Sequence, residues 1–172
     1  MRSPHFPRTA GGLALSLVAA CALAQAPAPT LPTAAQTDPV TLGWMVGSPP
    51  PANKVVQFYD GSFYKFPQFR WSFSNYRQLA PTTNVSRGTA PAVALPRAER
   101  KDLDAVSFTP LGKTEPMTWG QAFDANYTDG VLVMHKGKVV YERYAGALSA
   151  DKQHMAMSVT KSFFGLIGAI LV

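Results

Sequence analysis

One cysteine, Cys21, and three histidines are all that the 172 residues contain of the side chains that most often bind transition metals. A single cysteine excludes an intrachain disulfide framework. The histidines, His5, His135 and His154, lie far apart and lack the close ligand spacing of a zinc site. A glycine-rich phosphate loop before a helix is also missing. We therefore expect neither a metal ion nor another cofactor.

Basic clusters are missing too, although the formal net charge is +6. The 16 lysines and arginines are scattered along the chain and never form a block. Proteins that bind nucleic acids gather basic residues on one face. The pattern therefore argues against a nucleic-acid partner and favours an ordinary solvated surface.

Residues 1–24 predict a secretory signal. Two arginines precede the apolar run 13–20, and Ala-Leu-Ala at 22–24 offers a cleavage site. The run is shorter than the roughly 20 residues that span a bilayer. A rival interpretation makes Cys21 the lipidated cysteine of a lipoprotein, which would anchor the chain to a membrane. In either case we expect export to the periplasm or beyond, and loss of the signal lowers the net charge from +6 to +4 because both its arginines are removed.

Composition divides the remaining chain into two parts. Residues 25–40 are rich in alanine and proline and predict a disordered linker. Residues 41–172 predict the folded part, and their first half shows little periodicity. We expect Trp71, Phe73 and Tyr76 to be packing residues.

Helical patterns are short in this region. A helix is expected from about Ser74 to Leu79, where Pro81 ends it. A second helix is expected to begin near Thr118.

The clearest local pattern is a β-hairpin. A strand is predicted from Val131 to His135, a tight turn at Lys136-Gly137, and a second strand from Lys138 to Tyr144. The first strand is almost continuously apolar, so we expect both of its faces to be covered.

A serine followed three residues later by a lysine occurs three times, at 62–65, 149–152 and 158–161. Such a pair lies on one face of a helix, where the lysine amine can take the proton of a serine nucleophile. The surroundings separate the three tetrads. Only the third precedes a long apolar run, 163–172, which predicts a helix buried inside a domain.

Ser158 is the predicted nucleophile and Lys161 the predicted general base. The free N–H groups at a helix start favour an alkoxide and an oxyanion, and burial would lower the pKa of the lysine amine toward neutrality. The interpretation requires both groups to share a dry pocket at the start of an interior helix. The alternative is a serine that caps the helix beside a lysine on the surface.

Three segments carry a resemblance to a known family: 129–137 (DGVLVMHKG), 142–144 (ERY) and 154–163 (HMAMSVTKSF). Together they resemble the serine β-lactamase and penicillin-recognising superfamily, nearest to its 6-aminohexanoate-dimer hydrolase, carboxylesterase-like branch. Residues 70–77 (RWSFSNYR) and the following Pro-Thr at 81–82 resemble the N-terminal portion of that branch.

The resemblance implies an α+β fold of the β-lactamase/transpeptidase type, an antiparallel sheet flanked by helices. It implies that Ser158 is acylated, that Lys161 assists its deprotonation, and that the N–H of Ser158 supplies half of an oxyanion hole. Family members also use a later tyrosine and a later strand that provides the second oxyanion donor. None of the six tyrosines follows Ser158, so we interpret 41–172 as an incomplete hydrolase domain truncated after the nucleophile helix.

The expected function of the complete domain is hydrolysis of an amide or ester bond in a small-molecule substrate through an acyl-enzyme. Two alternatives stay open. The chain could be an inactive fragment or an exported binding or scaffold protein that keeps the N-terminal part of the fold. It could also hold a membrane-anchored segment, if the apolar run from Phe163 continues beyond Val172.

Overall fold

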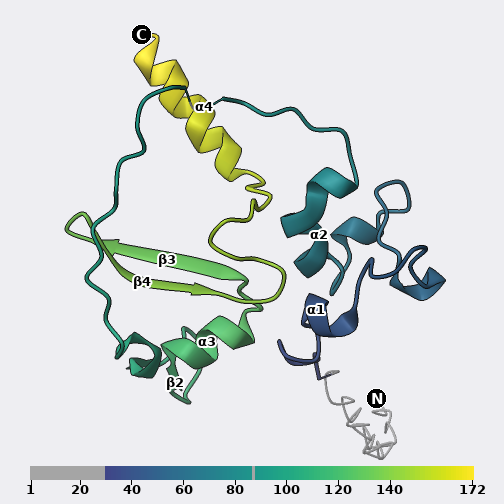
Figure 1. Ribbon diagram of the computed structural model, residues 1–172. Helices are drawn as coiled ribbons and strands as arrows, with labels where there is room; N and C mark the ends of the chain where they lie inside the picture. Colours follow the sequence, from purple (N-terminus) through teal and green to yellow (C-terminus); the bar gives the residue numbers. More distant parts are fainter. Residues whose placement is uncertain (1–29, 87) are drawn as a thin grey trace, which may run out of the picture. The chain divides into compact units, whose positions relative to one another are not determined.

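The computed structural model describes residues 30–86 and 88–172 (Figure 1). Residues 31–172 form one compact unit, to which the description below refers. The predicted signal, 1–24, lies outside the described residues. In the described part, no helix combines the length and the apolar character needed to cross a membrane.

The part of the predicted linker that the structure describes has local order. A turn at 34–37 leads into helix α1, Pro39–Leu42. Oδ1 of Asp38 accepts hydrogen bonds from the amides of Val40 and Thr41, the arrangement of an N-cap. The structure therefore differs from the expected linker over 34–40, because this segment has its own cap and contacts.

Helix α2, Phe69–Asn75, and the 3-10 helix η3, Tyr76–Gln78, replace the helix expected at 74–79. The helical segment starts earlier than expected because its first turns carry a buried tryptophan, Trp71. With Trp44 and Val56, this residue forms a hydrophobic core cluster. The predicted packing role of the aromatic residues is confirmed, since Phe73 and Tyr76 are half-buried in ring contacts. Two more 3-10 helices, η1 (Ala52–Lys54) and η2 (Ser62–Tyr64), lie between α1 and α2.

Helix α3, Trp119–Ala125, begins directly after Thr118, as predicted. A capping box fixes this start: Oγ1 of Thr118 accepts the amide of Gln121, and Oε1 of Gln121 accepts the amide of Thr118. A short antiparallel pair, β1 (Ser107–Phe108) with β2 (Met117–Thr118), precedes the helix, and the 3-10 helix η4, Leu103–Ala105, contacts it.

The predicted hairpin is confirmed as β3, Gly130–His135, paired with β4, Lys138–Tyr144. Both residues of its turn have positive φ angles, 49° at Lys136 and 75° at Gly137, as a two-residue hairpin loop requires. The second strand packs inward, with Val139 and Tyr141 buried. Residues 96–100 run beside this strand and bond to its backbone, which covers part of its edge.

The expectation that both faces of the first strand are covered is wrong. Leu132 and Met134 are exposed, because no described segment packs over them. The two antiparallel pairs and the helices make the described unit a mixed α and β structure. The expected α+β class is therefore confirmed only as a mixture of helices and small antiparallel sheets.

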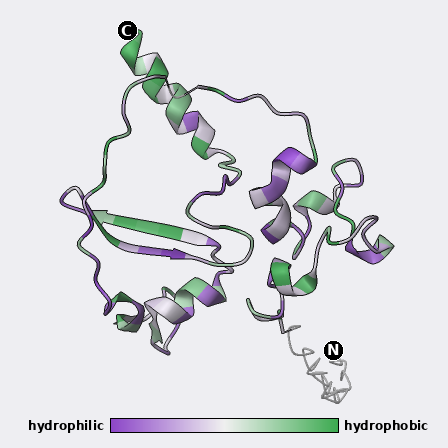
Figure 2. Ribbon diagram, viewed as in Figure 1, coloured by the Kyte–Doolittle hydropathy of each residue, from purple (hydrophilic) through white to green (hydrophobic). Residues whose placement is uncertain are grey.

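Helix α4, Val159–Ile170, begins directly after Ser158 and is apolar along most of its length (Figure 2). The prediction that this helix is buried is wrong for the described chain, since none of its residues is buried. Phe164, for example, is 70% exposed. The reason is that no described element covers it.

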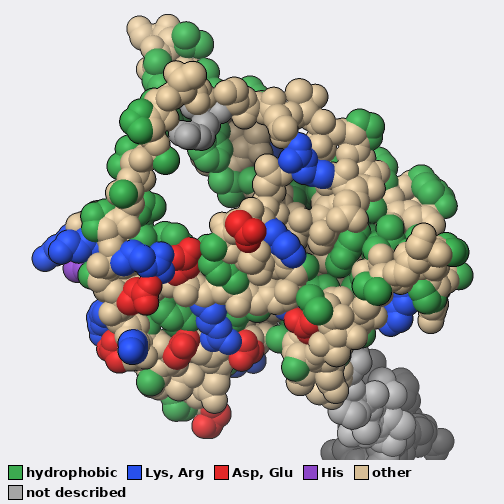
Figure 3. Space-filling model, in the orientation of Figure 1, with side chains coloured by type: hydrophobic (Ala, Val, Ile, Leu, Met, Phe, Trp, Pro, Cys, Tyr) green, Lys and Arg blue, Asp and Glu red, His purple; other side chains and the backbone are tan. Residues whose placement is uncertain are grey.

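Charged groups on the hairpin are paired across short distances. Arg97 bonds Glu142, and Arg143 bonds Asp124. Figure 3 shows Lys and Arg side chains interspersed with Asp and Glu on the visible face.

Candidate active site

The structure brings the two predicted catalytic side chains together at the start of α4. Nζ of Lys161 donates a hydrogen bond to Oγ of Ser158 over 3.1 Å. The two residues are separated by one helical turn, which aligns their side chains without help from a distant loop. The arrangement places a potential proton acceptor directly on the serine hydroxyl.

The alternative of a simple capping serine finds no support in the geometry. Ser158 has αR backbone angles, φ −70° and ψ −8°, and its side chain makes no capping hydrogen bond. An N-cap residue typically has extended angles and accepts an amide from the first turn. The Ser158 hydroxyl is therefore engaged by the lysine instead of by the helix.

The residue before the serine adopts an unusual conformation. Met157 has a φ of 50°, in the left-handed region, which is costly for a residue with a large side chain. Such strain costs on the order of 1–3 kcal/mol and persists only where the surroundings fix it. Met157 lies where the chain turns into α4. Strained residues of this kind are more frequent at functional sites than elsewhere.

The environment of the pair differs from the predicted one. Ser158 and Lys161 are both exposed, so the dry pocket that the interpretation requires is not formed by the described residues. The physical reason is the same as for α4, over whose start no described segment packs. The Ser158 and Lys161 side chains lie within hydrogen-bond distance, as the interpretation requires, but the described residues do not bury them.

The other two Ser-x-x-Lys tetrads have structural roles. The hydroxyl of Ser62 is bonded to the backbone of Gln57, as donor and as acceptor. Ser149 donates to Asp151, and Lys152 donates to the carbonyl of Ala147. Of the three tetrads, only 158–161 has a hydrogen bond between the side chains of its serine and its lysine.

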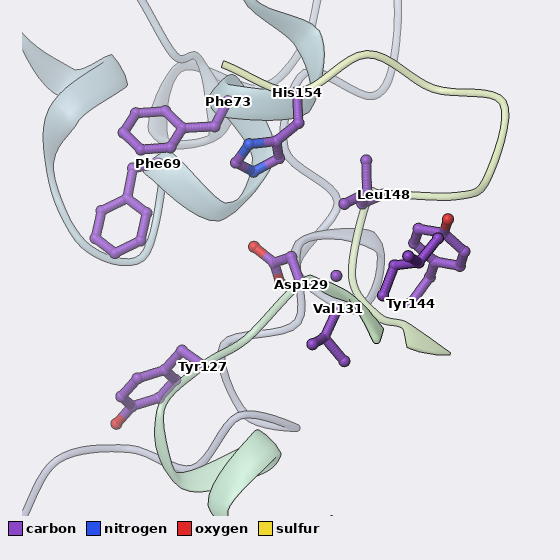
Figure 4. Close-up of a pocket in the computed structure, with 10 residues that line it drawn as sticks. Phe69, Phe73, Tyr127, Asp129, Val131, Tyr144, Leu148 and His154 are labelled. Atoms are coloured by element: carbon purple, nitrogen blue, oxygen red, sulfur yellow. The ribbon is translucent and has the colours of Figure 1, made fainter. Parts of the chain in front are cut away.

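A pocket of about 450 Å³ is lined by residues that precede Ser158 in the sequence (Figure 4). It is lined by Phe69, Phe73, Tyr127, Asp129, Gly130, Val131, Leu132, Tyr144, Leu148 and His154. His154 is exposed, its Nδ1 lies 3.0 Å from the carbonyl oxygen of Met155, and its ring stands edge-on to Phe73.

Asp129 is the one carboxylate in the lining of this pocket. Burial raises the pKa of the Asp129 carboxyl, and the hydrogen bonds from Arg70 oppose that rise. No local pattern in the sequence indicates that these two residues form a pair, because 59 positions separate them. The described residues contain no group of three or more His, Cys, Asp or Glu side chains that could hold a metal ion.

Comparison with known proteins relates this chain to hydrolases connected with the β-lactamase superfamily, as a partial and distant match. It is 33% identical over 111 residues to a 6-aminohexanoate-dimer hydrolase of Paenarthrobacter ureafaciens, a match that covers 64% of this chain and 26% of that protein. Among solved structures, it resembles a putative 6-aminohexanoate-dimer hydrolase from Bacillus anthracis, with a TM-score of 0.58 and 25% identity, over 70% of this chain and 30% of that one. No protein-family model matches the chain.

The chain thus spans about a quarter of the length of the curated relative that it matches. The likeness covers most of the described unit and reaches only a minor part of each relative. It supports a relation of this chain to hydrolases, and the activity of this chain is a proposal.

Proposed function

We propose that this chain carries the nucleophile portion of a β-lactamase-related serine hydrolase that cleaves an amide or ester bond in a small molecule. The observation that carries the proposal is the 3.1 Å hydrogen bond from Lys161 to Ser158 at the start of α4. The names of the two relatives, both hydrolases, support the same class.

The proposed chemistry begins with a neutral lysine. The amine of Lys161 takes the proton of Ser158 while Oγ attacks the substrate carbonyl carbon, and the tetrahedral oxyanion is held in part by the N–H of Ser158. The carbonyl re-forms as the bond to the leaving amine or alcohol breaks, and that group departs with the proton that Lys161 took from Ser158. Water then cleaves the acyl-Ser158 ester and releases the acid.

The site needs further polypeptide to work in this way. We infer that segments outside this chain cover α4, exclude water from the lysine and supply a second oxyanion donor and a tyrosine. Two observations support this: α4 exposes its apolar side chains, and the curated relative is about four times as long as the matched part. Desolvation by such a cover would favour the neutral amine.

We propose that the protein is exported. The support is the charge and apolar pattern of residues 1–24, together with a candidate cleavage site before Gln25. Mass spectrometry of the mature N-terminus separates the two routes. A chain that starts at Gln25 indicates soluble export, and one that starts at a lipid-modified Cys21 indicates a lipoprotein. An intact Met1 would contradict both.

A second candidate function is a binding or scaffold protein without catalysis. The exposure of both Ser158 and Lys161 favours it, because the described residues form no dry pocket around the pair. The two candidates differ in one measurable property, the reactivity of Ser158.

Labelling with a fluorophosphonate probe tests the proposal. The protein in its natural full length is expected to form a covalent adduct on Ser158, located by peptide mass spectrometry, and Ser158→Ala is expected to abolish it. Ser149→Ala is a matched control, since this serine belongs to another Ser-x-x-Lys tetrad. Equal labelling of the Ser158→Ala variant, or no labelling of the natural protein, would contradict the assignment.

A further inference from the structure

The segment just before the strained turn is tied to helix α2 through its backbone. The amide of Met155 donates to the carbonyl oxygen of Phe73 over 2.8 Å. This carbonyl belongs to the last turn of α2, where carbonyl groups have no partner within the helix. The bond therefore satisfies a helix end and fixes the loop three residues before Ser158.

A side-chain bridge reinforces this tie. Nη1 of Arg77 donates to Oε1 of Gln153 over 3.1 Å, and its Nε donates to Oγ1 of Thr82 over 3.3 Å. Its Nη2 donates to Oδ1 of Asn84. The planar guanidinium holds several acceptors in fixed directions, which a lysine cannot do. One arginine thus joins η3, the 82–84 segment and the loop that leads to Ser158.

The residue between these two anchors also contacts α2. The ring of His154 stands edge-on to the ring of Phe73, with centroids 5.9 Å apart (Figure 4). Gln153, His154 and Met155 are therefore held by three separate contacts to residues 69–78. This arrangement fixes the chain immediately before Met157, whose left-handed conformation needs such a constraint.

We propose that Arg77 is a positioning residue for the nucleophile Ser158. It acts through Gln153 and the Phe73–Met155 backbone bond, which together hold the turn that aims the Ser158 hydroxyl, and it does not touch the substrate. The inference rests on the proposed hydrolase function, since positioning has a consequence only if Ser158 reacts.

The test measures two quantities separately in the protein at its natural full length. With a saturating fluorophosphonate probe, Arg77→Ala is expected to lower the rate constant of Ser158 labelling by about ten- to a hundredfold, because small misplacements of a reacting group cost that much. The final labelled amount is expected to equal that of the wild type. A role in folding alone would lower the labelled amount and leave the rate constant of the folded molecules unchanged.

Arg100→Ala is the matched control. This arginine is also exposed and bonded by its guanidinium, in this case to Asp102, on a segment that does not lead to Ser158. Its replacement is expected to change neither the rate constant nor the labelled amount.

Gln153→Ala provides a second, milder variant if Arg77→Ala fails to fold. It is expected to slow labelling as well, and the double variant is expected to be no slower than Arg77→Ala alone, because both changes remove the same bridge. Hydrogen exchange at the Met155 amide is expected to be faster in Arg77→Ala than in Arg100→Ala.

Three results would overturn the proposal. The first is a wild-type rate constant with full labelling in Arg77→Ala, and the second is a reduced labelled amount with an unchanged rate constant. The third is a double variant whose labelling rate constant is lowered by the product of the two single reductions. If the wild-type protein does not label at Ser158, the hydrolase function itself fails, and the exchange rate of the Met155 amide then shows separately whether the bridge exists.

Discussion

Arg70 donates from both Nε and Nη2 to one oxygen of Asp129, Oδ1, over 3.1 and 2.7 Å. Its Nη1 donates to the carbonyl of Ala34 and to the hydroxyl of Thr37. The Arg70 side chain is only 2% exposed. A single buried cation in α2 therefore connects the turn before α1 with the residue that precedes β3.

Removal of this cation is expected to destabilise the fold strongly. Arg70→Met keeps most of the side-chain volume and leaves the buried Asp129 carboxylate without its partner. Loss of one member of a buried ion pair costs about 3–5 kcal/mol. Chemical denaturation should show this loss in the free energy of unfolding.

The exposed pair of Arg100 and Asp102 is the natural comparison. Arg100→Ala is expected to change the free energy of unfolding by less than about 1 kcal/mol, because exposed ion pairs contribute little. If Arg70→Met were no more destabilising than Arg100→Ala, the buried pair would have no role in holding the segments together.

Replacement of the predicted base should separate chemistry from stability. Lys161→Ala is expected to slow acylation of Ser158 at least about a hundredfold, the usual loss when a general base is removed. The exposed position of Lys161 predicts an unfolding midpoint close to that of the wild type. The probe labelling rate and the melting curve of the same sample give both values.

Lys152→Ala is the control for this change, since Lys152 belongs to another tetrad and bonds the carbonyl of Ala147. It should leave acylation unaffected. An unchanged rate in Lys161→Ala would remove this lysine from the mechanism and leave the helix start as the only activating feature.

The hairpin should lose stability in acid through Glu142. Hydrogen bonds from Tyr144 and Arg97 hold the pKa of the Glu142 carboxyl below its ordinary value of 4.5. A carboxyl whose pKa is lower in the folded state stabilises the protein above the unfolded-state pKa, and this contribution disappears as the pH falls through the folded-state pKa. The stability advantage of the wild type over Glu142→Gln should therefore be complete above about pH 5 and shrink below pH 4.5.

Melting temperatures of both proteins, taken between about pH 3 and 7 in steps of roughly 0.5 pH unit, would measure this difference. Asp129 acts in the opposite direction, because burial raises its pKa, but it is present in both proteins and cancels. The exposed Glu115 serves as control through Glu115→Gln. A constant difference between wild type and Glu142→Gln over the whole range would contradict the prediction.

Features set by neighbouring residues could be predicted from the sequence. The Lys136-Gly137 turn follows from the need for positive φ angles, and the start of α3 from the cap at Thr118. The one-turn spacing of Ser158 and Lys161 follows from helix geometry. Each of these depends on a few consecutive residues, whose physical chemistry is contained in the local pattern.

Features that depend on distant partners could not be predicted. The Arg70–Asp129 pair joins positions 59 residues apart, and Arg77 reaches Gln153 across 76. The burial of α4 was predicted wrongly for the described chain for the same reason. Apolar composition shows that a helix favours a nonpolar surrounding, and only the packed partners decide whether it has one.

The exposed face of α4 leads to the last prediction. Phe163, Ile167 and Ile170 lie on one side of the helix, at i, i+4 and i+7, and all three are more than half exposed. Each such side chain gains about 1.5–3 kcal/mol when fully buried. The 172-residue chain by itself should therefore self-associate and bind hydrophobic dyes, and Ile167→Lys with Ile170→Lys should reduce both.

Leu111→Lys is the control, because this leucine is fully exposed and belongs to a turn outside α4. It should leave self-association unchanged, as measured by sedimentation velocity over a range of concentrations. In the natural full-length protein the Ile167 and Ile170 changes should have the opposite consequence and lower the unfolding midpoint, because the same face would then be covered. A chain that stays monomeric and dye-free, or a full-length protein that tolerates both lysines, would show that α4 has no polypeptide partner.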